Sequence, residues 1–349
     1  MGEKAFLPDD KVRQWIDELS RTYSVLVPRQ ADDSIVFQSF DPEAEIPLDR
    51  QPTVPPKEAL FPKSETLLLY KYDKDPEQPG RQKLSIKERQ PAEKQVVFGA
   101  RPCGARGFSI FDPVFEQGDY QDPYYQARRE NTLFITVACS MPENTCFCHW
   151  VGGSPTDPTG SDILLVPVQS GYLVEQVTER AGSLLSSKLL EEAGAAQEEG
   201  QKVKQAAADC LEEPPDLTDL PERLLQLFDN LDFWDKASAK CISCGACTYL
   251  CPTCYCFNIT DEPSGMAGRR LRSWDNCMSY LFTLEGSGHN PRPTKAHRLR
   301  NRVGHKFSYY PELHERVFAC CGCGRCIKSC PVCVDIREIV TSAKEYRDE

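Results

Sequence analysis

The feature that most constrains this 349-residue chain is a cysteine motif that occurs twice. The first copy is Cys241-x2-Cys244-x2-Cys247-x3-Cys251-Pro252, and the second is Cys320-x2-Cys323-x2-Cys326-x3-Cys330-Pro331. In each copy three thiols lie close together, and a fourth follows next to a proline. Thiols at this density outside a secreted scaffold favour a bound metal centre over ordinary packing.

This spacing is typical of the loops that hold [4Fe–4S] clusters in bacterial ferredoxins, where the fourth cysteine of each run binds the other cluster. We therefore assign the first cluster to Cys241, Cys244, Cys247 and Cys330, and the second cluster to Cys320, Cys323, Cys326 and Cys251. Zinc is the alternative, but zinc sites usually join two C-x2-C pairs across a longer loop. The sequence predicts two [4Fe–4S] clusters.

The rest of the sequence excludes several classes of protein. No apolar run approaches the ~18–20 residues that span a bilayer, and residues 1–10 have no secretory apolar region. We expect no membrane span and a cytoplasmic location in an anaerobic host, where thiols stay reduced. The net charge of −11 argues against a chain that coats nucleic acid.

A basic stripe between residues 268 and 306 is the exception to this acidic character. It contains nine Lys and Arg residues but only two acidic ones, Asp275 and Glu285. We interpret the stripe as neutralising cluster charge or docking an acidic partner. A solvated basic face and a nucleic-acid site are the alternatives, and we expect no nucleic-acid partner.

The expected fold class is α+β, with an N-terminal α/β domain followed by an α-helical ferredoxin domain. We place the α/β domain at residues 1–165, a helical connector at 166–235, and the ferredoxin domain at 236–349, with an insert at 252–319. Periodicity predicts helices over about 10–20, after Gly104 and over 222–239, and a helical stretch over 172–213, either continuous or in two pieces broken near residues 194–200. It also predicts strands at 23–27 and 35–40 and buried strands at 66–70, 95–99 and 132–138. The proline-rich segment 41–63 is expected to be an extended loop outside the core.

Four cysteines precede the predicted connector: Cys103, Cys139, Cys146 and Cys148. Cys103 and Cys139 each follow a predicted strand, so both thiols would emerge at one sheet edge if the strands are parallel neighbours. Cys146 and Cys148 are two residues apart, which places their side chains on one side of an extended loop. We hypothesise a third iron–sulfur cluster held by these four thiols. Structural zinc and ordinary free cysteines remain alternatives.

Further motifs resemble one known family. They are Cys251-Pro-Thr-Cys-Tyr-Cys-Phe257, Trp274-Asp-Asn-Cys277, Arg298-x-Arg-x-Arg302, His305-Lys306, Pro55-Pro56-Lys57 and Gly99-x-Arg101-Pro102-Cys103. The sequence resembles the iron–sulfur β subunit of soluble sulfhydrogenase-type nickel–iron hydrogenases and the A subunit of anaerobic sulfite reductase. Related subunits accompany flavin oxidoreductases coupled to heterodisulfide reductase.

The resemblance implies a non-catalytic subunit that carries electrons between a FAD- and NAD(P)-binding reductase subunit and a second redox subunit. That second subunit would be of the nickel–iron hydrogenase, heterodisulfide reductase or sulfite reductase type. The chain has no G-x-G-x-x-G run, phosphate-binding loop or G-x-S-x-G motif of its own. The alternative is a reductase subunit with its own catalytic iron–sulfur site.

Overall fold

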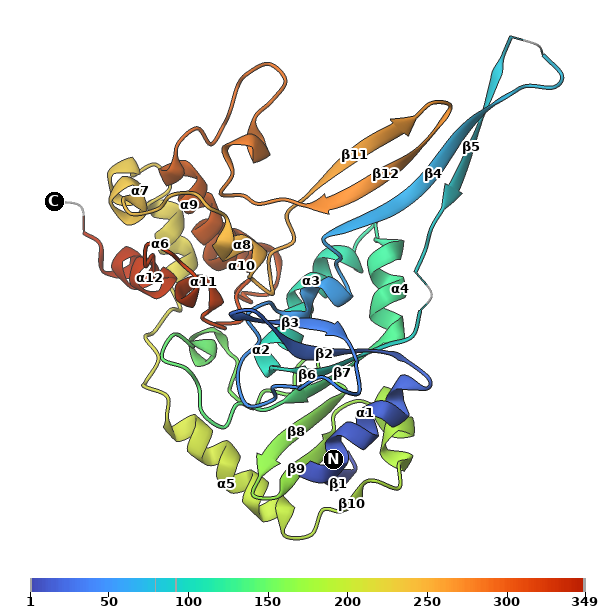
Figure 1. Cartoon of the computed structure of the whole chain (residues 1–349). Coiled ribbons are helices and arrows are strands. Elements are labelled where there is room, and N and C mark those ends of the chain that lie inside the picture. Colours follow the sequence, from blue (N-terminus) through green and yellow to red (C-terminus); the bar gives the residue numbers. More distant parts are fainter. Residues whose placement is uncertain (1, 79, 92, 348–349) are drawn as a thin grey trace.

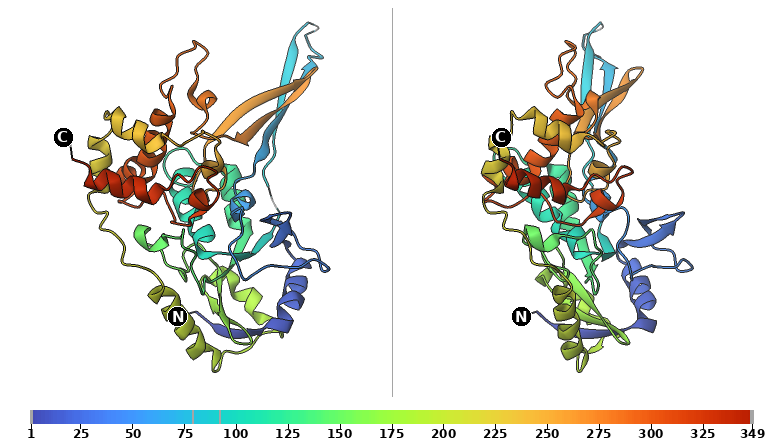
Figure 2. Two further views of the ribbon diagram at one scale, coloured as in Figure 1. Left: turned by 60° about the vertical axis from the view of Figure 1, so that its left-hand side comes forward. Right: turned by 90° about the vertical axis from the view of Figure 1, so that its left-hand side faces the viewer.

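The computed structural model describes residues 2–78, 80–91 and 93–347. These residues form a sheet-based N-terminal region, a helical C-terminal region and an arm of long strands that projects away from both (Figure 1). Views from other directions show the same separation of sheet, helices and arm (Figure 2). The mixture of helices and strands agrees with the predicted α+β class.

The main sheet of the described residues contains eight strands. Their order is β10 (Glu191–Glu192), β1 (Lys4–Pro8), β9 (Gly171–Gln176), β8 (Ile163–Val168), β7 (Thr132–Val137), β6 (Gln95–Ala100), β2 (Ser24–Ala31) and β3 (Ser34–Ser39). The central strands β2, β6, β7 and β8 run parallel, and the outer strands pair antiparallel. Four of the predicted strands are confirmed here.

Helices cover both faces of this sheet because the central strands are apolar on both sides. Val96 and Phe98 pack with Trp15 of α1 (Val12–Ser20) on one face. Val97 packs on the other face with Phe108 of α3 (Phe108–Phe115), next to α2 (Pro102–Arg106) and α4 (Pro123–Asn131). The helices predicted over about 10–20 and after Gly104 are therefore confirmed.

The helix predicted over 172–213 is wrong in its first half. Residues 171–176 form β9, and the helix α5 covers only Ala196–Asp209. Leu173 and Val174 are both fully buried, on opposite faces of the sheet. A short apolar run buried on both sides cannot be distinguished from a helix by periodicity. The main sheet therefore extends to residue 192, beyond the boundary predicted at 165.

A second correction concerns the helix predicted over 222–239. The structure has two helices there, α6 (Leu220–Gln226) and α7 (Leu231–Ser238). Between them Asn230 accepts a hydrogen bond from the Phe233 N–H (3.0 Å) and so caps α7. An asparagine that satisfies a free N–H starts a new helix here.

The arm is a four-stranded antiparallel sheet in the order β11 (Phe257–Ser264), β12 (Ala267–Trp274), β4 (Ser64–Lys74) and β5 (Gln82–Glu88). Its inner strands come from the insert and from the N-terminal region, so the arm joins both. The prediction that 66–70 is a buried strand was wrong, because Leu69 is 40% exposed and its neighbours are half-buried. Apolar sequence alone did not reveal that this strand leaves the core.

The segment 41–63 was wrongly placed outside the core. It contains a 3-10 turn at Pro56–Ala59, and Leu60 and Phe61 are buried directly after it. The ring of Phe61 stacks on that of Trp274 with centroids 6.5 Å apart. This proline-rich segment therefore packs the N-terminal region against the insert through the contact between Phe61 and Trp274.

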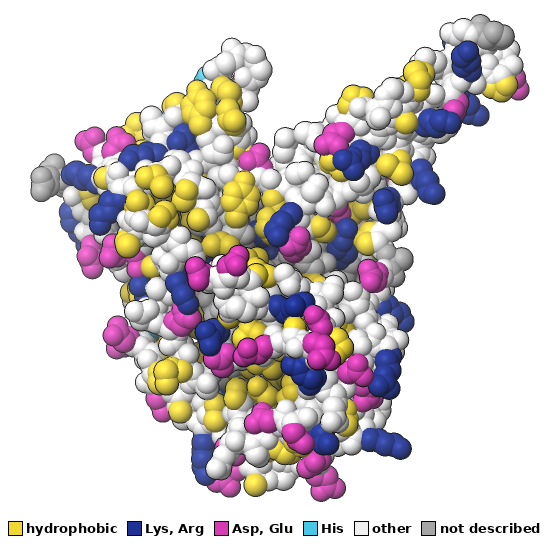
Figure 3. All heavy atoms as spheres, viewed as in Figure 1, with side chains coloured by type: hydrophobic (Ala, Val, Ile, Leu, Met, Phe, Trp, Pro, Cys, Tyr) yellow, Lys and Arg dark blue, Asp and Glu magenta, His cyan; other side chains and the backbone are white. Residues whose placement is uncertain are grey.

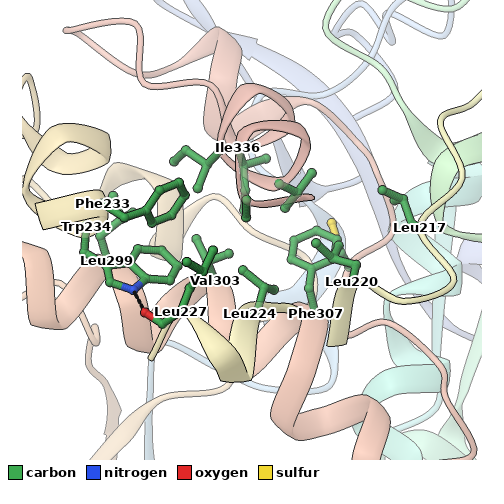
Figure 4. Close-up of a cluster of buried hydrophobic side chains, with 14 of the residues drawn as sticks. Leu217, Leu220, Leu224, Leu227, Phe233, Trp234, Leu299, Val303, Phe307 and Ile336 are labelled. Carbon is green, nitrogen blue, oxygen red and sulfur yellow. Dashed lines mark hydrogen bonds between the residues drawn. The ribbon is translucent and has the colours of Figure 1, made fainter. Parts of the chain in front are cut away.

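The helical region has its own core, drawn in Figure 4. Leucines of α6 face Leu299 and Val303 of α9 (Lys295–Gly304) and Ile336 of α12 (Ile336–Glu345). The indole N–H of Trp234 donates to the Leu227 carbonyl (2.8 Å). The cysteine motifs lie against this core, and each contains a single short helix, α8 (Ala246–Tyr249) or α11 (Arg325–Lys328).

Candidate metal centres

The first cysteine motif and the last cysteine of the second motif share one small pocket. Its thiols are Cys241, Cys244, Cys247, Cys326 and Cys330. Apolar side chains such as Met278, Leu299 and Ile339 form the rest of the wall. The structure thus brings Cys330 to the three thiols with which the sequence grouped it.

Backbone N–H groups point at two of these sulfurs. The Ser243 N–H lies 3.4 Å from Sγ of Cys241, and the Val334 N–H lies 3.2 Å from Sγ of Cys330. Gly245 adopts a φ of +79°, which lets the loop turn into α8 without a side-chain clash. N–H groups aimed at sulfur stabilise negative charge there, as a thiolate-bound centre requires.

The second group of predicted ligands is more deeply buried. Cys251, Cys320 and Cys323 are each less than 9% exposed. Burial raises the pKa of Cys320 to about 11. A hydrogen bond from the Cys321 thiol lowers the pKa of Cys323 to about 6. Burial opposes this shift, and the positive charge of Arg325 adds to it. The Gly322 N–H lies 3.4 Å from Sγ of Cys320, which repeats the geometry at Cys241.

Buried cations surround these thiols. Lys306 Nζ donates to Thr253 Oγ1 (2.7 Å) and to the Ala319 carbonyl (2.8 Å). Burial alone would lower the pKa of Lys306, but the thiolates of Cys251 and Cys254 raise it. A buried ammonium without a carboxylate partner needs another negative group nearby, and a thiolate centre supplies it.

The basic stripe thus divides by function. Arg298, Arg302 and Lys306 are buried beside the thiols, which agrees with charge neutralisation. Arg269 and Arg270 instead pair with Glu262 and Asp261 on the exposed arm. The described part of the chain therefore does not present the stripe as one continuous basic surface.

The four N-terminal cysteines also converge. Cys103, Cys139, Cys146 and Cys148 line a cavity of about 250 Å³ at the carboxyl ends of β6 and β7, as the sequence predicted. Gly322 and Cys323 of the second motif form part of the same wall. Sequence reasoning missed this proximity, which no local pattern encodes.

Among the described residues, no three His, Cys, Asp or Glu side chains come close enough to hold a single metal ion. This holds for the motif cysteines and for the N-terminal cysteines alike.

Cys254 and Cys333, which hold matching places after the two motifs, have different surroundings. Cys254 is half-buried, lies 3.4 Å from Arg302 Nη1 and offers its carbonyl to Lys57 Nζ (3.0 Å). Cys333 is exposed. The sequence did not predict that Lys57 contacts this site. Its motif, Pro55-Pro56-Lys57, was noted only as part of the family resemblance.

Residues 240–334 match the family described as a 4Fe-4S dicluster domain. The C-terminal region is a 4Fe–4S dicluster domain. The match implies [4Fe–4S] clusters in this region, and the Sγ atoms and N–H groups described above form a suitable donor set. None of the described helices has both the length and the apolarity needed to span a bilayer.

The resemblance over the whole chain is also confirmed. The chain is 29% identical to sulfhydrogenase 2 subunit beta of Pyrococcus furiosus over 351 residues, which cover 95% of this chain and 94% of that protein. No solved structure matches the chain. The similarity includes the N-terminal sheet and the arm as well as the dicluster domain.

Proposed function

We propose that this chain is the iron–sulfur electron-transfer subunit of an anaerobic oxidoreductase complex, and that it does not catalyse a reaction on its own. It would accept electrons from a FAD- and NAD(P)-binding subunit and deliver them to a second redox subunit, or carry them in reverse. The observation that carries the proposal is the dicluster domain within a chain that matches a sulfhydrogenase beta subunit end to end.

In this proposal one cluster is bound by Cys241, Cys244, Cys247 and Cys330, and the other by Cys320, Cys323, Cys326 and Cys251. A [4Fe–4S] cluster, when bound, takes up and releases single electrons. The protein controls the potential through burial, charge and N–H donors. Arg302 and Lys306 supply the buried positive charge, and Ser243, Gly322 and Val334 supply N–H donors.

The projecting arm supports membership of a complex. It exposes Leu69, Tyr72, Leu84, Ile86, Ile259 and Met266, each at least 39% accessible. Apolar side chains are also visible on the outside of the helical region (Figure 3). Exposed apolar patches of this kind mark protein interaction sites, so the arm is our candidate for the surface that meets another subunit.

The test is anaerobic purification of the tagged full-length chain from its own host, together with assays of the chain alone. We expect flavin and a second redox-metal subunit to co-purify with it. The isolated, cluster-loaded chain should show at least two cubane EPR signals after reduction and no turnover of hydrogen, sulfite or a heterodisulfide with reduced viologen. Turnover by the isolated chain would instead establish the alternative, a reductase subunit with its own site.

A further inference from the structure

We propose that the N-terminal cavity binds a third iron–sulfur cluster through Cys103, Cys139, Cys146 and Cys148. This goes beyond the proposed function, which requires only the dicluster domain. The site lies outside residues 240–334, which match the dicluster family.

The fold brings the four thiols together from three separate segments. Cys103 follows β6 and Cys139 follows β7, and these strands are parallel neighbours, so both residues lie at one sheet edge. Cys146 and Cys148 come from the loop that enters the 3-10 turn Cys148–Val151. All four line the same cavity of about 250 Å³, far larger than the voids that normal packing leaves.

The second cysteine motif holds the Cys146–Cys148 loop in place. The Phe147 N–H donates to the Gly322 carbonyl (2.8 Å). A Cβ on Gly322 would lie 2.4 Å from the Phe147 carbonyl oxygen, and one on Gly324 would lie 2.5 Å from that of Thr145. Both glycines also have positive φ, so no other residue fits well at either position. This close approach places the cavity directly beside Cys323.

A buried guanidinium provides a second, independent observation. Arg325 is 2% exposed, and its Nε donates to the Pro52 carbonyl (3.0 Å) while Nη1 lies 3.7 Å from Sγ of Cys103. Its Nη2 is buried and has no hydrogen-bond partner among the described residues. A buried charge is stable only when it is paired, and the Cys103 sulfur that Nη1 contacts would become negative on binding a cluster.

A second buried cation lies on the cavity wall. Arg101 is 4% exposed and donates to the carbonyls of Ala138 (3.0 Å) and Leu48 (2.7 Å). Four thiolates around an iron–sulfur core carry net negative charge. Two guanidinium groups beside the cavity would stabilise that charge in a low-dielectric setting.

Iron and sulfide analysis of the anaerobically purified full-length chain tests this inference. With four irons per cubane, we expect about twelve irons per chain for the native sequence and about eight for the Cys146→Ser/Cys148→Ser variant. The matched control is Cys210→Ser, an exposed cysteine next to α5, which should keep about twelve. About eight irons in all three proteins, or one zinc per chain that the double variant loses, would overturn the proposal.

A single variant keeps the proposal testable if the double variant loses all its iron. Cys139→Ser should alter one set of EPR and Mössbauer signals and leave the two dicluster signals unchanged. A spectrum identical to that of the native chain would refute a third cluster. The proposed function has separate readouts, because it fails if the native chain lacks the two dicluster signals or if the isolated chain turns over a substrate, and loss of a third cluster changes neither result.

Discussion

Arg302 Nη1 lies 3.4 Å from Sγ of Cys254, although the two residues are 48 positions apart. Nη2 of the same guanidinium donates to the Cys247 carbonyl (2.5 Å). Arg302 is 4% exposed and lines the pocket that holds the first group of thiols. Arg302 of α9 therefore contacts both Cys247 of the first motif and Cys254, which follows that motif.

This position predicts an effect on reduction potential. Arg302→Gln removes a buried positive charge beside the cluster held by the first motif. The reduced cluster carries more negative charge, so its potential should fall by roughly 60 mV, which corresponds to about 1.4 kcal/mol for one electron. An EPR-monitored redox titration measures the change.

The control for that titration is Arg270→Gln. Arg270 makes an exposed ion pair with Asp261 on the arm (2.8 Å), on a different element from the two cysteine motifs. Its substitution should leave both potentials unchanged. Equal potentials for Arg302→Gln and the native chain would show that Arg302 does not tune the cluster.

The motif cysteines illustrate what the sequence could predict. Spacing placed Cys330 with Cys241, Cys244 and Cys247, and these four residues line one pocket of the structure. Spacing could not predict that Cys326 lines the same pocket. Nor could it show that Gly322 packs on Phe147, because such contacts depend on how two distant segments fold against each other.

The proposal that the fourth cysteine of each motif binds the cluster of the other motif gives a second prediction. Cys330→Ser should perturb the same EPR signal as Cys244→Ser, because both residues line the first pocket. Cys251→Ser should perturb the other signal, together with Cys320→Ser. If Cys330→Ser instead perturbs the same EPR signal as Cys320→Ser, the four cysteines of each motif bind one cluster.

A buried ion network at the base of the arm predicts a stability effect. Glu65 accepts from Arg272 Nε (2.7 Å) and from Arg128 Nη1 (2.6 Å), and it is 7% exposed. Glu65→Gln leaves Arg128 without its carboxylate partner and Arg272 with Asp122 alone, so it should cost about 3 kcal/mol. Thermal unfolding of the cluster-loaded chain should show a Tm lower by several degrees.

The matched control is Glu262→Gln. Glu262 pairs with Arg269 (2.7 Å) on the exposed part of the arm, where both side chains are at least half accessible. Exposed pairs contribute about 0–1 kcal/mol, so its Tm should change little. Similar Tm values for the two variants would show that the Glu65 network does not stabilise the fold.

The arm and β9 show why the rest of the fold escaped prediction. Thr66–Tyr70 has the composition of a buried strand, but its partner is β12, nearly 200 residues later in the chain. Leu173 and Val177 are four residues apart, a spacing compatible with a helix, and only pairing with the neighbouring strands β1 and β8 makes the run that contains Leu173 a strand. In both cases long-range pairing overrode the local pattern.

His305 predicts a pH dependence of stability. Burial, with Lys306 and Arg302 nearby, lowers the pKa of His305 from 6.5 to about 4. The folded state therefore binds fewer protons than the unfolded state between pH 6.5 and 4. His305 contributes stability above pH 6.5 that is lost as the pH falls toward 4. His305→Gln should accordingly flatten the decrease of Tm between pH 7 and 5.

The control for the pH dependence of Tm is a variant that keeps the His305 imidazole and removes its hydrogen-bond partner. His305 Nε2 lies 3.0 Å from the Tyr255 hydroxyl, so Tyr255→Phe deletes that hydrogen bond without removing the titrating group. This variant should be less stable at every pH but keep the steep decrease of Tm below pH 6.5. If the native chain and His305→Gln lose Tm equally over this range, the pH dependence arises from other groups, such as the thiols themselves.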